Sequence, residues 1–327
     1  MREVPVRFGD DVVLAGTLTL PDGPLPVPAV AIASGSGPLD RDSNHRRMRF
    51  DVARQLAHAL AAGGLASLRY DKRGVGESSG DWRRAGLGDN AEDLRYAVRT
   101  LAERPEVDAS RIQVAGHSEG ALLAAMVAAD GLPLTGAVLL SMSATPGDEL
   151  LRWQTRQIVP TLPGPVRALL RLFRVDLEAK VAKNHTKVRA TTTDVARIGG
   201  ARVNARWFRE FLDHDPRVDL RRLTLPVLAV TGSKDLQVDP ADLDTVATLV
   251  AGPATVERIP DLTHTLRRQA GPPSLRAYKR ELREPVDATL LEIVVAWCRA
   301  TAGLAVDAPS RETLTRTSQE PGLPESR

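Results

Sequence analysis

A serine framed by two glycines, at the junction of a strand and a helix, is the feature that most constrains this chain. The run Gly116–Gly120 reads Gly-His-Ser-Glu-Gly and follows Arg111–Ala115, which predicts a buried strand. It precedes Ala121–Ala129, which is apolar on nearly every side and predicts a buried helix. Such a turn exposes the serine hydroxyl at the sheet edge, and the helix N-terminus behind it offers free N–H groups to a developing negative charge. Ser118 is therefore predicted to be a nucleophile.

Strand and helix patterns alternate along most of the chain. Predicted strands cover Val4–Phe8, Val12–Leu20, Ala29–Ser34, Leu65–Tyr70, Arg111–Ala115, Gly136–Ser141, Pro226–Thr231 and Thr255–Ile259. Predicted helices cover Phe50–Ala62, Asn90–Ala102, Ala121–Ala129 and Ala288–Ala300. After an antiparallel start, this alternation predicts an α/β fold with a mostly parallel eight-stranded sheet and helices on both faces.

Residues 145–215 break the alternation. They contain Pro160 and Pro163, mostly helical patterns and no convincing strand, which predicts a helical cap inserted between two sheet strands. Between Leu151 and Ala190 there are nine Lys and Arg residues against two Asp and Glu. This charge is either a solvated face or a surface that attracts anionic substrates or lipid headgroups. Residues 1–306 are predicted to form one domain, and the polar segment 307–327 is predicted to be disordered.

A serine hydroxyl needs a base, and the base needs an acid that orients it. In the fold that carries this turn, the acid and then the histidine follow the serine in chain order. Asp235 lies in the turn after the strand Pro226–Thr231 and is the preferred acid; Asp239 and Asp242 are better explained as helix caps. Of six histidines, His264 follows the last predicted strand and is the preferred base. His117 is predicted to point away from the tip of the turn, because it neighbours Ser118.

An oxyanion hole requires two preorganised N–H donors. One is expected from the residue after the nucleophile, Glu119, and the other from the loop after the third strand. In that glycine-containing loop Ser36 is the preferred donor and Gly35 the second choice, since glycines let the backbone approach a substrate carbonyl closely.

Several motifs occur in one order along the chain. They are Gly35–Asp42 (Gly-Ser-Gly-Pro-Leu-Asp-Arg-Asp), Arg69–Ser78, Gly116–Gly120, Phe211–Pro216 and Gly232–Val238. Over about residues 3–300 the chain therefore resembles the α/β-hydrolase superfamily, specifically bacterial carboxylesterases with a G-S-G-P-x-D-R-D loop. The resemblance implies ester hydrolysis through Ser118, Asp235 and His264, with no metal or organic cofactor. The oxyanion loop of this chain begins with Ser34 before Gly35. Many lipases carry a histidine at that position before the glycine.

Four aromatic residues of the predicted cap are candidates for lining an acyl pocket. They are Trp153, Phe173, Trp207 and Phe208. Ordinary packing of the cap on the sheet explains them equally well.

The run Asp40-x-Asp42-x-Asn44 copies the opening of a calcium-binding loop. Its sixth position is His45 rather than glycine and its twelfth is Asp51 rather than glutamate, so a loop brace is the preferred interpretation. Asp71 and Arg73 are likewise expected to brace their own loop through hydrogen bonds.

Composition narrows the classes of function that fit the chain. The net charge is only +3, and no aromatic residues are interleaved with the basic ones as a nucleic-acid stacking platform requires. The single cysteine, Cys298, excludes an internal disulfide and a cysteine-based metal cage. The N-terminus lacks the apolar core of a signal peptide, and no apolar run approaches the roughly 20 residues of a membrane span. We therefore expect a cytoplasmic protein.

The predicted function is cleavage of carboxylic esters of small molecules through an acyl-enzyme. A serine peptidase and an acyl thioesterase share this set of residues and stay open as alternatives. A hydrolase fold that only binds a ligand is the third, although all three triad positions hold competent residues. The oligomeric state is left open by the sequence.

Overall fold

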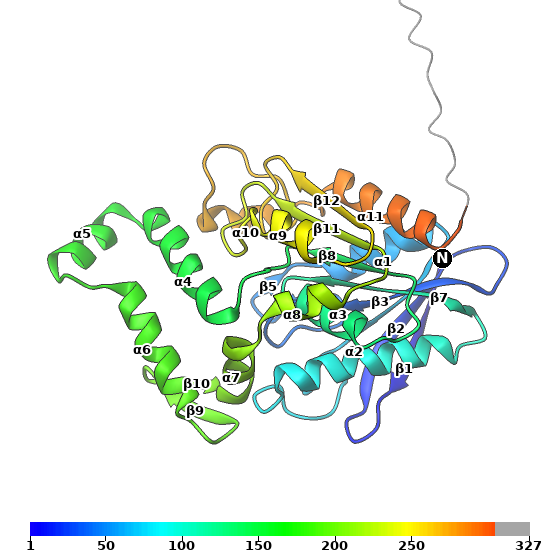
Figure 1. Ribbon diagram of the computed structural model, residues 1–327, viewed down its shortest axis with the longest axis horizontal. Coiled ribbons are helices and arrows are strands. Elements are labelled where there is room, and N and C mark those ends of the chain that lie inside the picture. Colours follow the sequence, from blue (N-terminus) through cyan, green and yellow to red (C-terminus); the bar gives the residue numbers. More distant parts are fainter. Residues whose placement is uncertain (305–327) are drawn as a thin grey trace, which may run out of the picture.

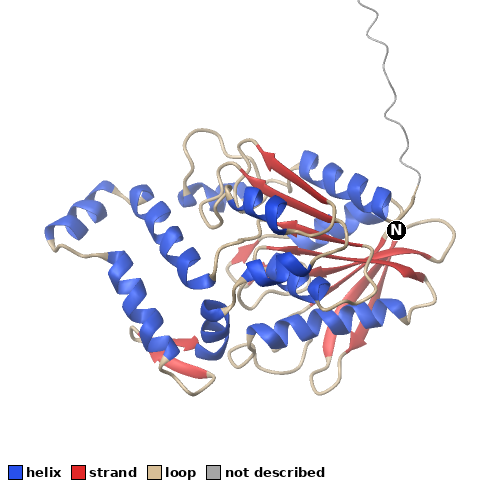
Figure 2. Ribbon diagram, viewed as in Figure 1, coloured by secondary structure: helices blue, strands red, loops and turns tan. Residues whose placement is uncertain are grey.

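A central sheet organises the molecule. The computed structural model describes residues 1–304, and its sheet has eight strands (Figures 1 and 2). In spatial order they are β1 (Arg2–Phe8), β2 (Leu14–Leu20), β6 (Ala66–Tyr70), β3 (Val27–Ala33), β7 (Val107–His117), β8 (Gly136–Leu140), β11 (Val227–Gly232) and β12 (Ala254–Ile259). The pairs β1–β2 and β2–β6 are antiparallel, and the remaining pairs are parallel. The predicted sheet is confirmed, whereas the predicted disordered segment 307–327 lies outside the described residues.

Helices cover both faces of the sheet, as predicted. One face carries α1 (Val52–Ala62) and α11 (Ala288–Thr301); the other carries α2 (Leu87–Ala102), α3 (Glu119–Ala129), α8 (Pro216–Arg222) and α9 (Asp242–Leu249). Shorter elements at the loops are β4 (Asn44–His45), β5 (Met48–Arg49), η2 (Leu275–Ala277) and α10 (Tyr278–Glu281). No helix of the described residues is both long enough and apolar enough to cross a lipid bilayer.

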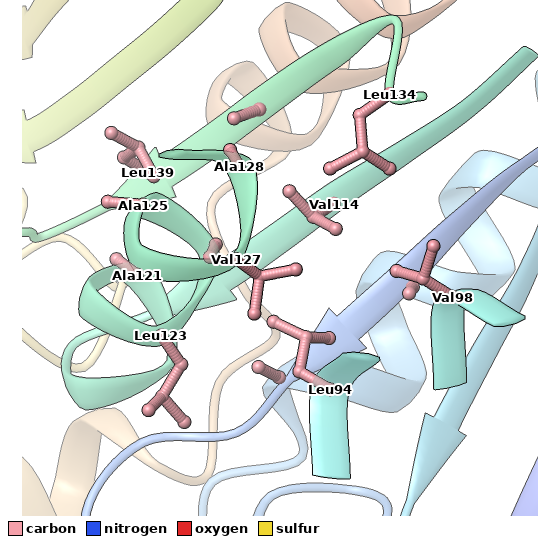
Figure 3. Close-up of a cluster of buried hydrophobic side chains, with 14 of the residues drawn as sticks. Leu94, Val98, Val114, Ala121, Leu123, Ala125, Val127, Ala128, Leu134 and Leu139 are labelled. Atoms are coloured by element: carbon pink, nitrogen blue, oxygen red, sulfur yellow. The ribbon is translucent and has the colours of Figure 1, made fainter. Parts of the chain in front are cut away.

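Two hydrophobic clusters, one on each face, hold the layers together. Along β3, Ala29 and Ala31 belong to one cluster and Val30 and Ile32 to the other, because successive strand side chains point to opposite faces. The helix α3 lies within the first cluster and is buried at every position except Met126, which explains its nearly uniform apolar sequence (Figure 3). Burial on both faces therefore accounts for the continuous apolar runs of the central strands.

A largely helical insertion, residues 145–215, connects β8 to the remainder of the sheet. It contains α4 (Gly147–Ile158), η1 (Val159–Thr161), α5 (Gly164–Leu172), α6 (Leu177–Arg189), β9 (Val195–Ile198), β10 (Ala201–Asn204) and α7 (Ala205–Asp213). In Figure 1 the helices α4, α5 and α6 extend to one side of the sheet. The prediction of no strand in this segment is wrong, because β9 and β10 form a hairpin. The two-residue turn of this hairpin is Gly199-Gly200, with both residues at positive φ. A Gly-Gly pair favours such a turn, so this pair was the signal in the sequence that indicates a hairpin.

The start of the insertion is fastened by Asp242, which was predicted to cap a helix. Asp242 is the first residue of α9, but its carboxylate accepts hydrogen bonds from Ser143 Oγ, Ala144 N and Thr145 Oγ1 at 2.9–3.0 Å. Asp239 makes the local bond expected at a helix start, accepting from Ala241 N at 2.9 Å. The prediction for Asp242 is therefore corrected: it ties the chain leaving β8 to a neighbouring helix.

The turn from β7 to α3 depends on two close backbone approaches. A Cβ on Gly116 would lie 1.9 Å from the carbonyl oxygen of Gly120, and a Cβ on Gly120 would lie 2.1 Å from that of Ala33. Between them Ser118 adopts φ 57° and ψ −120°, a conformation that L-residues rarely occupy. The glycines are therefore steric requirements of this turn.

We expect Gly116→Ala to destabilise the protein by at least about 2 kcal/mol, since the added methyl group meets backbone that cannot move aside. Gly164→Ala is a matched control, because a Cβ at Gly164 meets nothing within 4 Å, and its effect should stay within about 0.5 kcal/mol. Chemical denaturation of the purified variants measures both changes. Equal stabilities for the two variants would contradict this account of the turn.

Candidate active site

Three side chains from the ends of different strands form one hydrogen-bonded line. Ser118 follows β7, Asp235 follows β11 and His264 follows β12, so all three lie at the carboxyl edge of the parallel strands. His264 Nε2 lies 3.0 Å from Ser118 Oγ, and His264 Nδ1 lies 2.8 Å from Asp235 Oδ2. The structure thus brings together the three residues that the sequence selected as nucleophile, acid and base.

Asp235 is buried and fully engaged. Burial raises its pKa, but the charge of the His264 ring, the bond to that ring and two backbone amides lower it more, so its pKa lies below the ordinary value. The amides belong to Gln237 and Val238 and donate to Oδ1 at 2.7 and 2.9 Å. The carboxylate is therefore held as an anion, with one oxygen fixed by backbone and the other directed at His264.

The loop that carries His264 is fixed by buried polar contacts. The hydroxyls of Thr263 and Thr265 each donate to Glu281 Oε2 at 2.8 Å. The His117 ring donates through Nε2 to the His264 carbonyl oxygen at 2.9 Å. Burial, and then the charge of His264, lower the pKa of His117 to about 3, so His117 is a neutral donor. His117 was predicted to point away from the tip of the turn; its side chain lines the cavity that contains Ser118 and supports His264.

The predicted oxyanion donors surround Ser118. Glu119 is the first residue of α3, and a Cβ on Gly35 would lie 3.5 Å from Ser118 Cβ, so the Gly35–Ser36 loop passes beside the nucleophile. Gly35, Ser36 and Glu119 all line the cavity that contains Ser118. The Gly35–Ser36 loop and the N-terminus of α3 therefore border the same cavity as the serine hydroxyl.

Lys72 links the Gly35–Ser36 loop to the N-terminus of α3. Its Nζ donates to the Gly35 carbonyl oxygen at 2.7 Å and lies 2.9 Å from Glu119 Oε1, which also accepts from Asn90 Nδ2 at 2.9 Å. The side chains of Lys72 and Glu119 are only 9% and 1% exposed. Lys72 was not predicted as a site residue; its position just after the strand Leu65–Tyr70, at the same sheet edge as Gly35 and Glu119, was the signal in the sequence.

A cavity of about 310 Å³ opens onto Ser118 and His264, a size suited to small-molecule sites. Among the apolar residues of its wall are Leu122, Leu150, Leu151, Trp207, Phe208 and Phe211. Two of the four predicted aromatic residues, Trp207 and Phe208, are thus part of the wall.

The other two aromatic predictions are corrected. Trp153 is half-buried and packs against the hydrophobic core, as the alternative interpretation expected. Phe173 is 68% exposed at the end of α5 and does not line the cavity. The helical pattern of the insertion does not show which helices face the sheet. The positions of Trp153 and Phe173 depend on that arrangement, so the sequence could not predict them.

The calcium-like run Asp40-x-Asp42-x-Asn44 is occupied by protein donors. Asp40 Oδ1 accepts from the amides of Asp42 and Asn44 at 3.0 and 2.8 Å, and Asp42 Oδ1 accepts from Arg69 Nε at 2.8 Å. These bonds fit the preferred interpretation of a loop brace. The expected bracing roles of Asp71 and Arg73 also have partners: Arg41 N donates to Asp71 at 2.7 Å, and Arg73 pairs with Asp93 at 2.8 Å.

Comparison with known sequences places the chain in a family. Residues 49–269 match the hydrolase family described as "Serine aminopeptidase, S33". The chain is 27% identical over 287 residues to esterase EstD of Thermotoga maritima, a match that covers 87% of this chain and 65% of EstD. The chain thus spans slightly less than two thirds of the length of that relative.

Solved structures agree in fold at low sequence identity. Est1E from Butyrivibrio proteoclasticus superposes with a TM-score of 0.60 at 17% identity and covers 91% of this chain and 99% of its own. The α/β hydrolase GrgF from Penicillium sp. sh18 gives a TM-score of 0.63 at 16% identity, with coverages of 93% and 100%. The family match covers more than half of the chain, so this chain belongs to the serine aminopeptidase S33 family of α/β hydrolases.

Proposed function

We propose that this protein hydrolyses carboxylic esters of small molecules through an acyl-enzyme formed on Ser118. The observation that carries the proposal is the unbroken line from Asp235 through His264 to Ser118, which ends in an apolar cavity. The name of one similar protein points the same way, since EstD is an esterase. The predicted cytoplasmic location stays a prediction.

The geometry supports a two-step reaction. His264 Nε2 takes the proton of Ser118 Oγ as the oxygen attacks the ester carbonyl, and then gives that proton to the leaving alcohol. Asp235 orients the ring and stabilises its charged form. The N–H groups of Glu119 and of Ser36, with Gly35 as the alternative, receive the oxyanion. Water activated by His264 then attacks the acyl-serine and releases the acid.

Lys72 is a positioning residue in this proposal. Its ammonium binds the Gly35 carbonyl on one loop and the Glu119 carboxylate on the other, so it fixes the separation of the two donor loops. Because an oxyanion hole works through donors that are already in place, this separation has to be set before the substrate arrives.

The family description makes a peptidase the principal alternative. An aminopeptidase needs an anionic group that binds the substrate's amino terminus. Within the described chain, the cavity wall contains a single acidic side chain, Glu119, whose Oε1 is already shared by Lys72 and Asn90. This favours a neutral ester over a charged amino terminus. An acyl thioesterase would use the same residues, and a substrate panel separates the two.

Ser118→Ala should lower kcat/KM for p-nitrophenyl esters by at least about 10³-fold, because the attacking oxygen is lost. Ser110→Ala is the matched control: Ser110 lies on the same strand but is exposed, and its hydroxyl bonds Asp108 two residues away. Initial rates on esters from acetate to laurate, on aminoacyl p-nitroanilides and on acyl thioesters measure the effect and the preferred bond. Ester activity that survives in Ser118→Ala would refute the mechanism.

The ionisation of Asp235 should contribute nothing to the pH profile of kcat/KM above about pH 5. The pKa of Asp235 lies below its ordinary value, so its carboxylate is already ionised throughout that range. In Asp235→Asn, kcat should fall by about 10³–10⁴-fold, because the ring loses its orienting anion. A fully active Asp235→Asn would contradict the assigned acid.

Removing Lys72 should lower kcat and leave KM nearly unchanged. Lys72→Met alone strands a buried carboxylate, at a cost of about 3–5 kcal/mol, so the test uses Lys72→Met with Glu119→Gln. We expect kcat of this double variant to fall by about 10–100-fold, less than the loss of a donor itself. Glu119→Gln alone, in which Lys72 loses its carboxylate partner but keeps its bond to the Gly35 carbonyl oxygen, is the control, and thermal unfolding verifies that it is folded. Wild-type kcat in a folded double variant would remove Lys72 from the proposal.

A further inference from the structure

The helix α5 exposes an unusual amount of apolar surface. Leu172, Phe173 and Leu169 are 75%, 68% and 54% exposed, and Val166 and Val175 are also exposed. Along α5 only Leu170 is partly covered. Figure 1 shows α5 at the end of the insertion farthest from the sheet, joined to the body through α4 and α6. A contiguous apolar surface of this kind on a folded protein marks a place where something else binds.

The same segment is strongly basic. Residues 162–175 contain Arg167, Arg171 and Arg174 and no Asp or Glu. The side chains of these arginines form no ion pair with any residue between 1 and 304, whereas most other arginines of the insertion are paired, such as Arg152 with Asp148. Three positive charges are therefore available to an external anion.

Charged and apolar residues are separated around the helix. At 3.6 residues per turn, Val166, Leu169 and Phe173 share one face, and Arg167 and Arg171 lie together on another. The arginines also line a groove of about 550 Å³ between α5 and its neighbours, whose apolar wall includes Val159 and Leu170. A helix of this pattern lies in the plane of a membrane surface, with its apolar face among the acyl chains and its cations at the headgroups.

We infer that α5 and the turn after it, residues 164–175, bind an anionic lipid surface. Two other partners fit less well. A second copy of this chain, bound symmetrically through the same face, would oppose arginine to arginine, because the acidic residues nearest to them are already engaged: Asp176 caps α6 and Glu178 pairs with Arg156. A nucleic acid would satisfy the arginines but leave Leu169, Leu172 and Phe173 in water. An anionic lipid surface accommodates both features.

This binding site is separate from the proposed catalytic residues, so the inference does not rest on the proposed function. The exposed residues of α5 do not line the cavity at Ser118. Variants with substitutions in α5 should therefore keep their activity on water-soluble ester substrates. The two proposals can fail independently.

The test is sedimentation of the full chain with vesicles of phosphatidylcholine alone or mixed with phosphatidylglycerol. We expect binding to the anionic vesicles to be at least about tenfold tighter, and to weaken as salt screens the arginines. Leu169→Asp with Phe173→Asp should abolish binding. Arg167→Gln, Arg171→Gln and Arg174→Gln together should remove the preference for anionic vesicles.

The control is Val218→Asp, which places one such charge on a 52% exposed valine of α8 and should leave binding unchanged. Thermal unfolding verifies that each variant is folded, whether or not it hydrolyses esters. Equal binding of the wild type to both vesicles, or no binding at all, would overturn the inference. So would light scattering that shows a dimer lost in the Leu169→Asp, Phe173→Asp variant while its vesicle binding is retained.

Discussion

The arrangement of the candidate site depends on how closely the backbone of α3 approaches the ends of β3 and β7. Gly120 brings α3 against the carbonyl of Ala33, and Gly116 lets the chain reverse directly beneath Ser118. Any side chain at either glycine would push the helix outward. The helix N-terminus would then move away from the Gly35–Ser36 loop, and the proposed oxyanion donors would no longer share one space. A steric condition on two residues thus governs the positions of several functional groups.

Around this turn the sheet edge is built from buried charged groups that are ion-paired or hydrogen-bonded. Lys72 and Glu119 lie behind the oxyanion loops, Asp71 holds the loop of Arg41, and Glu281 holds the loop of His264 through two threonines. Burying such groups is costly unless each has its partner, so the loops are stable in only one arrangement. The side chains of Ser118 and His264 line the cavity in front of these loops.

The base and the tip of the insertion differ in how their side chains are covered. Among the contacts of the insertion with the body are those of α4, of Asn204 in β10, of α7 and of the chain fastened by Asp242, and its α7 contributes Trp207 and Phe208 to the cavity wall. Farther out, α5 keeps apolar and basic side chains in solvent. One inserted segment therefore shapes the proposed substrate cavity at its base and offers a separate surface at its tip.

The sequence alone determined the sheet, its helices and the choice of Ser118, Asp235 and His264, because these follow from local rules. Apolar periodicity identifies buried strands, and the order of motifs along the chain selects residues at strand ends that parallel topology must bring to one edge. Sequence could not identify Lys72 or His117 as supports, since their roles arise from contacts with residues far away along the chain. Nor could it separate Trp207 from Phe173, because a helical pattern shows which residues share a face but not what that face meets. Only the tertiary structure, in which α7 packs on the body and α5 does not, decided which aromatic residue lines the cavity and which lies in water.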